Sequence, residues 1–144
     1  MFKTRHKIEL SLLLLLLGGS IYLLFRSTSL VMFSWFKILK MDGIINILRS
    51  KLNDIQIPYL ILYCMPNMLW ISSYLIMIDA LKLDYSRNLF WSFIMPFIAV
   101  LFEILQIWNI IPGTFDLWDL ICLLLPSLLY LRHTLKKKLY ETGI

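Results

Sequence analysis

The sequence predicts an all-α, polytopic membrane protein that forms a single helical domain. Of its 144 residues, 60% are hydrophobic and only 16% are charged, whereas soluble domains contain about 45–50% apolar and about 25% charged residues. The apolar residues gather in four long runs, and charged residues separate these runs. A chain of this length suits one compact helical bundle rather than two domains.

The first apolar run covers residues 8–25 and follows Lys3, Arg5 and Lys7. A basic start followed by an apolar run also resembles a signal peptide. The run continues past Gly18-Gly19-Ser20, however, and no small-x-small cleavage site closes it. We therefore expect an uncleaved membrane-anchoring helix.

Residues 26–56 mix apolar side chains at helical spacing with frequent charges. Lys37, Lys40, Arg49 and Lys51 make a membrane span here unfavourable. The pattern predicts one or two amphipathic helices that lie in the membrane interface and are separated at Asp42-Gly43. A re-entrant hairpin is the alternative interpretation.

Three further spans are predicted over residues 57–80, 89–108 and 117–131. A bilayer core takes about 20 helical residues, so the last span is short, and Trp118 and Tyr130 suit interfacial positions at its ends. Backbone groups cannot stay unpaired in lipid, so all four spans should be helices. Pro66 permits a kink in the second span.

Basic residues set the orientation of a multi-pass protein, with the richer side in the cytoplasm. If both termini are cytoplasmic, nine basic residues lie inside and five lie outside. This predicts a bacterial cytoplasmic-membrane protein with both termini in the cytoplasm. The inside set comprises Lys3, Arg5, Lys7, Lys82, Arg87, Arg132, Lys136, Lys137 and Lys138, and the outside set comprises Arg26, Lys37, Lys40, Arg49 and Lys51.

Other classes of site receive little support. The net charge is +5, but the basic residues form no face separate from the apolar runs. Membrane lipid is therefore a better partner than nucleic acid. Cys64 and Cys122 fall within apolar runs and are interpreted as small buried side chains. A disulfide between them is the alternative interpretation. The sequence has no metal-ligand spacing and no phosphate-binding loop, so no metal or cofactor is expected.

One acidic constellation stands out. Glu103 lies inside the third span, and Gln106 shares its helical face three residues later. Asp116 and Asp119 lie at the start of the fourth span, after a turn expected at Pro112-Gly113. An ionisable group inside a span costs about 2.5–3.5 kcal/mol at its centre, so such a group usually has a function. These four residues are the candidate binding site, on the outer face of the membrane.

Each member also has a structural interpretation. Asp116 could cap the fourth helix, and Asp119 suits the positive end of the same helix. Glu103 could be protonated or hydrogen-bonded and so fix helix packing. Asn67, in the second span, is also included in the candidate site. It could bridge to the third span, or it could serve as a simple contact between helices.

The five basic residues on the outer side are potential partners for the carboxylates of the candidate site. Residues 109–120 contain no Lys or Arg, so three nearby carboxylates would repel one another. Arg26 or Arg49 is therefore expected to fold over the site and pair with Glu103, Asp116 or Asp119. Both arginines are included in the candidate site.

The order of these elements resembles the VanZ-like family of small bacterial membrane proteins. Glu103 and Gln106 match its Glu-x-x-Gln helix, and Asp116 and Asp119 match its loop aspartate and the aspartate that opens the last helix. Met65 to Trp70 is similar to a Leu-Pro-x-Gly-Leu-Trp element of some members. Phe115 departs from the family, in which an Arg often precedes the loop aspartate. The resemblance implies a cell-envelope role, linked in the founding member to glycopeptide resistance.

Three hypotheses of function follow. The first is a non-enzymatic envelope protein that binds an amphiphile or lipid headgroup at the acidic site. The second is an accessory subunit, because the apolar surface also suits a partner membrane protein or a second copy of the chain. The third, a carboxylate-dependent enzyme, is the weakest. His6 and His133 lie far from the carboxylates, and no catalytic residue is assigned.

Overall fold

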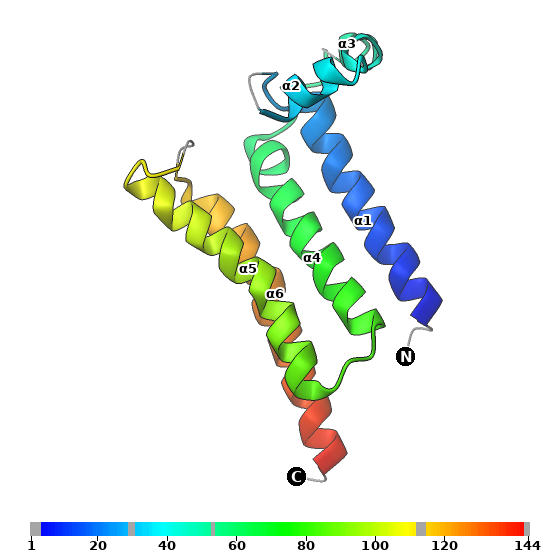
Figure 1. The fold of residues 1–144 in the computed structure, drawn as a ribbon, viewed down its shortest axis with the longest axis vertical. Coiled ribbons are helices and arrows are strands. Elements are labelled where there is room, and N and C mark those ends of the chain that lie inside the picture. Colours follow the sequence, from blue (N-terminus) through cyan, green and yellow to red (C-terminus); the bar gives the residue numbers. More distant parts are fainter. Residues whose placement is uncertain (1–3, 29–30, 53, 112–114, 143–144) are drawn as a thin grey trace.

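The computed structural model describes residues 4–28, 31–52, 54–111 and 115–142, and every regular element in them is helical, which confirms the all-α class. The elements run along the chain as shown in Figure 1. They are α1 (Thr4–Phe25), α2 (Val31–Ile38), α3 (Asp42–Ser50), the π-helix η1 (Leu60–Cys64), α4 (Met65–Ala80), α5 (Tyr85–Ile107) and α6 (Leu117–Thr142).

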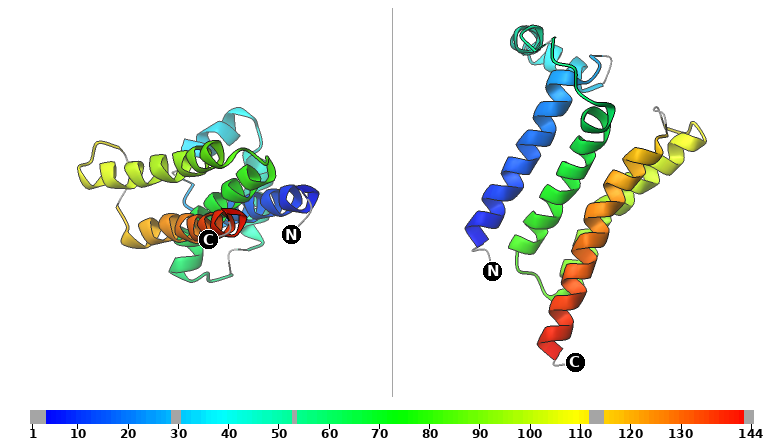
Figure 2. Two further views of the ribbon diagram at one scale, coloured as in Figure 1. Left: turned by 90° about the horizontal axis from the view of Figure 1, so that it is seen from below. Right: turned by 180° about the vertical axis from the view of Figure 1, so that it is seen from behind.

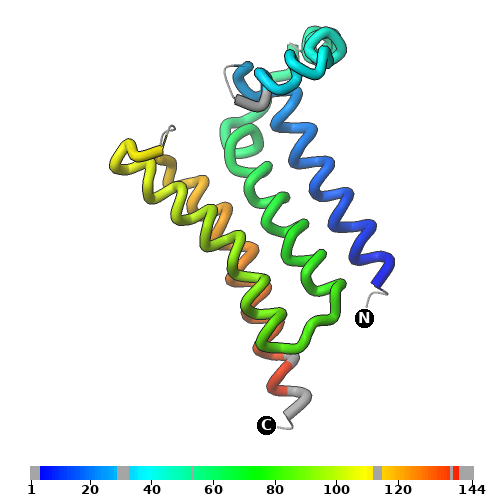
Figure 3. The backbone as a smooth tube through the Cα atoms, viewed as in Figure 1, coloured from blue at the N-terminus to red at the C-terminus, as the bar shows by residue number. Residues whose placement is uncertain are grey.

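Helix α4 lies between α1 on one side and the α5–α6 pair on the other. Both ends of the chain lie at the same end of the bundle, which we call the termini end (Figures 2 and 3). The opposite end, where α1 and α5 finish and where η1 and α6 begin, is called the loop end. The short helices α2 and α3 lie beyond α1 at the loop end.

The contact between α1 and α4 is made by small residues. Ser11 and Ser73 are buried, and each hydroxyl donates a hydrogen bond to the other residue's backbone carbonyl, at 2.8 and 2.7 Å. Gly18 lies two turns further along α1, where a Cβ atom would meet the Trp70 indole at 2.8 Å. Small side chains let helices approach closely, as in other membrane bundles. At the termini end, Lys7 pairs with Asp79.

Apolar packing and one buried amide hold α5 and α6 to the bundle. Ile71 and Leu75 of α4 pack with Leu123 of α6 to form the core cluster. The buried Asn88 of α5 accepts a hydrogen bond from the Tyr130 hydroxyl of α6 at 2.8 Å. Because a buried amide without a partner is costly, this bond fixes the two helices in one register.

A π turn, η1, directly precedes α4. In η1 the hydrogen bonds span five residues, and the Met65 N–H donates to the Leu60 carbonyl. Pro66 follows directly and has no N–H to donate. A π turn beside such a proline accommodates the missing hydrogen bond, so the expected irregularity of the second span takes this form.

One predicted break was wrong. The break in residues 26–56 lies at Lys40, which has φ of 56°, and Asp42-Gly43 begins α3 instead. The N–H groups of Lys40 and Met41 donate to the carbonyls of Lys37 and Phe36, which is the hydrogen-bond pattern of a Schellman motif. At the other end of the chain, the helix α6 continues past the apolar run predicted as the fourth span, to Thr142.

Among the described residues, three helical segments are long and apolar enough to cross a membrane: Thr4–Phe25, Leu60–Ala80 and Tyr85–Ile107. They correspond to the first three predicted spans. The predicted fourth span falls in the first half of α6, whose second half carries the exposed Arg132, Lys136 and Lys138. The turn expected at Pro112-Gly113 lies outside the described residues.

Candidate functional site

The loop end brings together polar side chains from five helical elements and the segments beside them. Arg26 follows α1, Tyr59 precedes η1, Asn67 lies in the first turn of α4, and Glu103 lies in the last two turns of α5. Asp116 and Asp119 flank the start of α6. We call these six residues the loop-end cluster. They are Arg26, Tyr59, Asn67, Glu103, Asp116 and Asp119.

Asp116 is the N-cap of α6. Its Oδ1 accepts a hydrogen bond from the Trp118 N–H at 2.9 Å, and its backbone carbonyl accepts one from the Leu120 N–H at 3.2 Å. The capping interpretation of Asp116 is therefore confirmed. Its Oδ2 accepts a hydrogen bond from the Tyr59 hydroxyl. That bond raises the pKa of Tyr59 to about 12, because the neutral phenol is the form that donates to the carboxylate.

Glu103 lies about 6 Å along the helix axis from the end of α5. Its side chain accepts a hydrogen bond from the Asp116 backbone N–H, so α5 and the start of α6 are joined directly. Its Oε2 is buried and has no hydrogen-bond partner among the described residues. An unpartnered buried polar group costs about 1–3 kcal/mol.

Asp119 contacts α4 rather than its own helix. It makes side-chain hydrogen bonds with Asn67 and Cys64, and its Oδ1 is buried without a partner in the described part of the chain. Asn67 therefore bridges from α4 to α6, whereas the sequence suggested a bridge to the third span. The Cys64 and Cys122 thiols are free and lie close enough to interact.

Arg26 lies over two tyrosine rings, with its Cζ 4.4 Å from the Tyr63 centroid and 5.2 Å from the Tyr22 centroid. It is close enough to Asp119 for its charge to act on that carboxyl group. The ion pairs formed by the described residues within 4.0 Å nevertheless do not include Arg26. Its Nη1 is buried and lacks a hydrogen-bond partner among those residues.

Arg49 has a different role from the one expected. Its Nη1 and Nη2 donate to the backbone carbonyls of Leu23 and Arg26, at 2.7 and 2.8 Å. Its guanidinium also lies 5.2 Å from the Phe33 ring centroid. Arg49 thus satisfies carbonyls that the last turn of α1 leaves without helical partners, and it fixes α3 to α1. The structure shows no ion pair between Arg49 and the carboxylates of the described residues.

Gln106 lies near the end of α5, one turn beyond Glu103. Its backbone carbonyl accepts the N–H of Asn109, but no described contact joins its side chain to Glu103, Asp116 or Asp119. Sequence reasoning missed Tyr59, Tyr63 and Tyr22. Tyr22 lies four residues before Arg26, and Tyr59 lies four residues before Tyr63, which is the spacing of neighbours on one helical face.

No group of three or more His, Cys, Asp or Glu side chains in the described ranges could hold a metal ion. Within the cluster, three carboxyl groups face one guanidinium. Two carboxyl oxygens and one guanidinium nitrogen stay without partners. These three atoms therefore keep unused hydrogen-bonding capacity, as acceptors at Glu103 and Asp119 and as a donor at Arg26.

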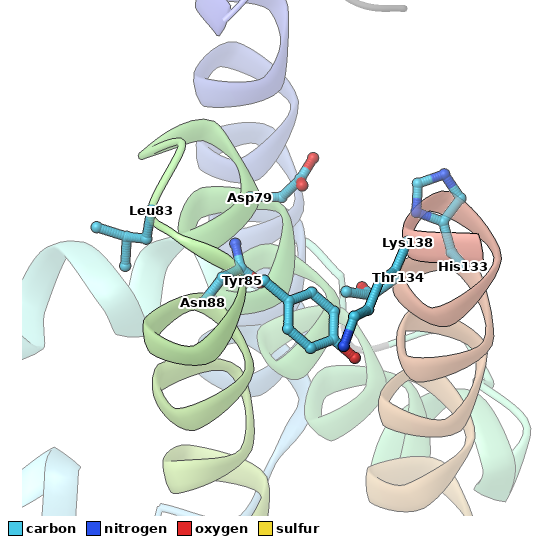
Figure 4. Close-up of a pocket in the computed structure, with 7 residues that line it drawn as sticks. All are labelled: Asp79, Leu83, Tyr85, Asn88, His133, Thr134 and Lys138. Carbon is cyan, nitrogen blue, oxygen red and sulfur yellow. The ribbon is translucent and has the colours of Figure 1, made fainter. Parts of the chain in front are cut away.

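A hollow of about 130 Å³ lies at the termini end (Figure 4). Asp79, Leu83, Tyr85, Asn88, His133, Thr134 and Lys138 line it. Its polar groups already contact protein neighbours. Asp79 pairs with Lys7, Thr134 donates to the Tyr130 carbonyl, and Lys138 lies 4.4 Å from the Tyr85 ring centroid. It is therefore a weaker candidate than the loop-end cluster.

Comparison of the chain with protein-family models, with curated proteins and with solved structures finds no match. The resemblance to VanZ-like proteins stays a prediction.

Proposed function

We propose that the chain is a multi-pass protein of the bacterial cytoplasmic membrane, with both termini in the cytoplasm and the loop end outside. Three membrane-length apolar helices and the position of both termini at one end of the bundle support this topology. The first half of α6 is the fourth span. The larger group of basic residues, including Lys82, Arg87 and Arg132, then lies on the cytoplasmic side.

The proposed function is to bind the polar headgroup of a membrane amphiphile at the loop-end cluster. The observation that carries this proposal is the set of three buried atoms without partners, which come from three different parts of the fold. They are Arg26 Nη1, Glu103 Oε2 and Asp119 Oδ1. A headgroup with both donors and an acceptor would satisfy them together and remove the cost of leaving them unpaired.

The helices α2 and α3 support a location in the headgroup layer. Exposed apolar side chains on them, such as Ile38, Ile44 and Ile47, alternate with Lys37 and Arg49. Helices of this composition lie in the membrane interface, where each basic residue contributes about 1 kcal/mol toward anionic lipid. In this arrangement α2 and α3 would flank the entrance to the cluster.

The proposal includes membership of the VanZ-like family and a role in envelope-stress or glycopeptide resistance. Its support is the pattern of Glu103, Gln106, Asp116 and Asp119 described above. Loss of resistance in a strain that carries Glu103→Gln, with a normal amount of protein in the membrane, would agree with this role.

The binding test compares wild-type protein with Glu103→Gln, Asp119→Asn and Arg26→Gln. Each is extracted in mild detergent, and the retained lipid is measured by mass spectrometry. Each variant is expected to lose retained lipid by at least about tenfold, as for a lost hydrogen bond to a charged group. The control is Asp84→Asn, because the Asp84 side chain is 74% exposed at the termini end.

Two results would contradict the proposal. If the variants of the loop-end cluster fold and retain as much lipid as wild type does, the three unpartnered atoms do not bind a headgroup. Cluster variants that fail to accumulate, while Asp84→Asn accumulates normally, would assign these residues to the scaffold.

A second candidate, an accessory subunit of a membrane complex, is favoured by the outer face of α1. Leu13 and Leu16 on this face are 53% and 67% exposed, so lipid or a partner helix must cover them. A partner that co-purifies at a fixed ratio and is lost in Leu13→Lys would support this candidate. Retention of the same partner by Leu13→Lys would exclude this face as its contact.

A further inference from the structure

An apolar groove of about 240 Å³ runs between α5 and α6. Its wall on α5 consists of Phe93, Pro96, Phe97 and Val100, and its wall on α6 consists of Leu124, Ser127 and Leu128. The Ser127 hydroxyl donates to the Leu123 carbonyl at 3.1 Å, so the one polar side chain in the groove is satisfied within its own helix. The groove therefore offers hydrocarbon contact alone.

The groove exists because small or compact residues form its floor. Pro96 and Ser127 are buried, while Phe97 and Leu128 project beside them and stay 67% and 59% exposed. Residues with short side chains leave a depression between two larger neighbours. A depression of this kind in a membrane-facing surface fits one extended hydrocarbon chain.

The end of the groove formed by Val100 and Leu124 is the end nearer to the loop-end cluster. Val100, Pro96 and Phe93 lie three, seven and ten residues before Glu103, which places them on one face of α5. The distance along the helix from Glu103 to Phe93 is about 15 Å. On α6, Leu124 lies five residues after Asp119. A polar group at the cluster could therefore be attached to a chain that lies in the groove.

The buried atoms of the cluster that lack hydrogen-bond partners define the polar group. Glu103 Oε2 and Asp119 Oδ1 can only accept hydrogen bonds when ionised, so they need N–H or O–H donors. Arg26 Nη1 can only donate, so it needs an acceptor such as a phosphate oxygen. Because three carboxyl groups oppose one guanidinium, a donor with positive charge is favoured over a neutral hydroxyl.

We propose that the groove and the cluster together hold one zwitterionic phospholipid with a primary amine, of the phosphoethanolamine type. Its hydrocarbon chain lies between α5 and α6, its ammonium group contacts Glu103 and Asp119, and its phosphate contacts Arg26. This inference rests on the proposed function and narrows it to one headgroup chemistry. A choline headgroup has no N–H donor, and a glycerol headgroup has no positive charge, so both fit less well.

The test measures binding of three phospholipids with identical chains and ethanolamine, choline or glycerol headgroups, by native mass spectrometry of the delipidated protein. The ethanolamine lipid is expected to bind at least about tenfold more tightly than the other two, because hydrogen bonds to charged groups separate them. The N-acetylated ethanolamine lipid, which lacks the ammonium group, is expected to bind as weakly as the choline lipid.

A matched pair of variants tests the groove. Leu128→Trp fills it, whereas Leu129→Trp changes a neighbouring leucine that does not line it, and the two leucines are similarly exposed, at 59% and 55%. Binding of the ethanolamine lipid is expected to fall about tenfold in Leu128→Trp and to be unchanged in Leu129→Trp. Equal binding in both would overturn the groove as the chain site.

The remaining outcomes separate this inference from the proposed function. If the choline or glycerol lipid binds as tightly as the ethanolamine lipid, and Glu103→Gln weakens that binding, the headgroup assignment is wrong while the proposed function stands. If no lipid depends on Glu103 or Asp119, both proposals fail. The N-acetylated lipid needs only wild-type protein, so it decides the headgroup assignment even if a variant does not fold.

Discussion

Asp116 connects three parts of the loop end through single hydrogen bonds. Its side chain caps α6 and accepts the Tyr59 hydroxyl, and its backbone N–H donates to Glu103. The cap could be predicted from sequence, because an aspartate directly before an apolar helix is a common N-cap. The other two contacts depend on how α5 and η1 meet α6, and no local pattern encodes that.

Replacing Asp116 separates the cap from the Tyr59 contact. Asp116→Ala is expected to lower the free energy of unfolding by about 1 kcal/mol, the usual cost of a lost cap. Asp116→Asn should be closer to wild type, because its amide oxygen still accepts the Trp118 N–H. Thermal unfolding in one detergent compares them. Equal stability of Asp116→Ala and wild type would show that the cap contributes little.

Arg49 is the residue whose expected and observed roles differ most. The sequence shows a basic residue in a predicted amphipathic helix, and it predicts the carboxylates of the candidate site as partners of this residue. The structure instead places the guanidinium on two backbone carbonyls at the end of α1. Carbonyls that lack helical partners exist at every helix end, so this pairing could be found only once α3 was placed beside α1.

Arg49→Gln is expected to lower stability by about 1–3 kcal/mol, because two carbonyls lose a charged donor. Lys51→Gln removes an exposed basic residue nearby and should change stability by less than about 0.5 kcal/mol. Thermal unfolding of both variants measures the difference. Similar small losses in both would show that Arg49 acts only as a surface charge.

At the scale of elements, α1 and α4 share the most extensive contact of any two helices in the described residues. Ser11 and Gly18 of α1 allow this approach, and Trp70 of α4 packs over Gly18 and against Tyr22, with ring centroids 5.2 Å apart. The apolar runs predicted that both helices exist. The small residues inside those runs became informative only when the neighbouring helix was known.

Gly18→Ala is expected to cost about 1–3 kcal/mol, because the new methyl group would lie 2.8 Å from the Trp70 indole. Gly19→Ala is the matched control, since a Cβ there meets nothing within 4 Å. Unfolding of the two variants in the same detergent makes the comparison. If Gly18→Ala were as stable as Gly19→Ala, the indole would have to move at little cost.

Element boundaries were the least predictable part of the fold. Hydropathy marks where lipid contact can end, but a helix continues as long as its backbone bonds and neighbours allow. Helix α6 therefore runs beyond its apolar part into a basic segment, with Arg132, Lys136 and Lys138 exposed. The sequence did not predict the break at Lys40, because a lysine with positive φ is unusual. The nearby Gly43 is a residue type that more often ends a helix.

At the scale of the whole molecule, both chain ends lie at one end of the bundle, and the loop-end cluster lies at the other. The sequence correctly grouped Glu103, Asp116 and Asp119, because they flank one connection between adjacent helices. It did not predict that Tyr59 belongs to the cluster, or that Asn67 pairs with Asp119. These depend on η1 and α4 packing against α6, which are distant in sequence.

The proposed topology predicts that a fluorescent protein that folds only in the cytoplasm is active when fused at either terminus. A periplasmic reporter inserted at Asn46 of α3 is expected to be active instead, since Asn46 is exposed at the loop end. The positive-inside distribution is the physical reason. Cytoplasmic activity of the Asn46 insertion would reverse the proposed orientation and place the cluster on the cytoplasmic face.

The π turn at Leu60–Cys64 has a consequence for how this segment responds to a deletion. A π turn holds one more residue than the α-helical path. Deleting Ile61, which is exposed, would remove that extra residue and let the segment become an ordinary helix. Because the extra residue is absorbed within the turn, Tyr59 would keep its direction toward Asp116 and α4 would keep its register. This part of the chain should thus tolerate a one-residue deletion that would rotate the flanking residues of a regular helix by about 100°.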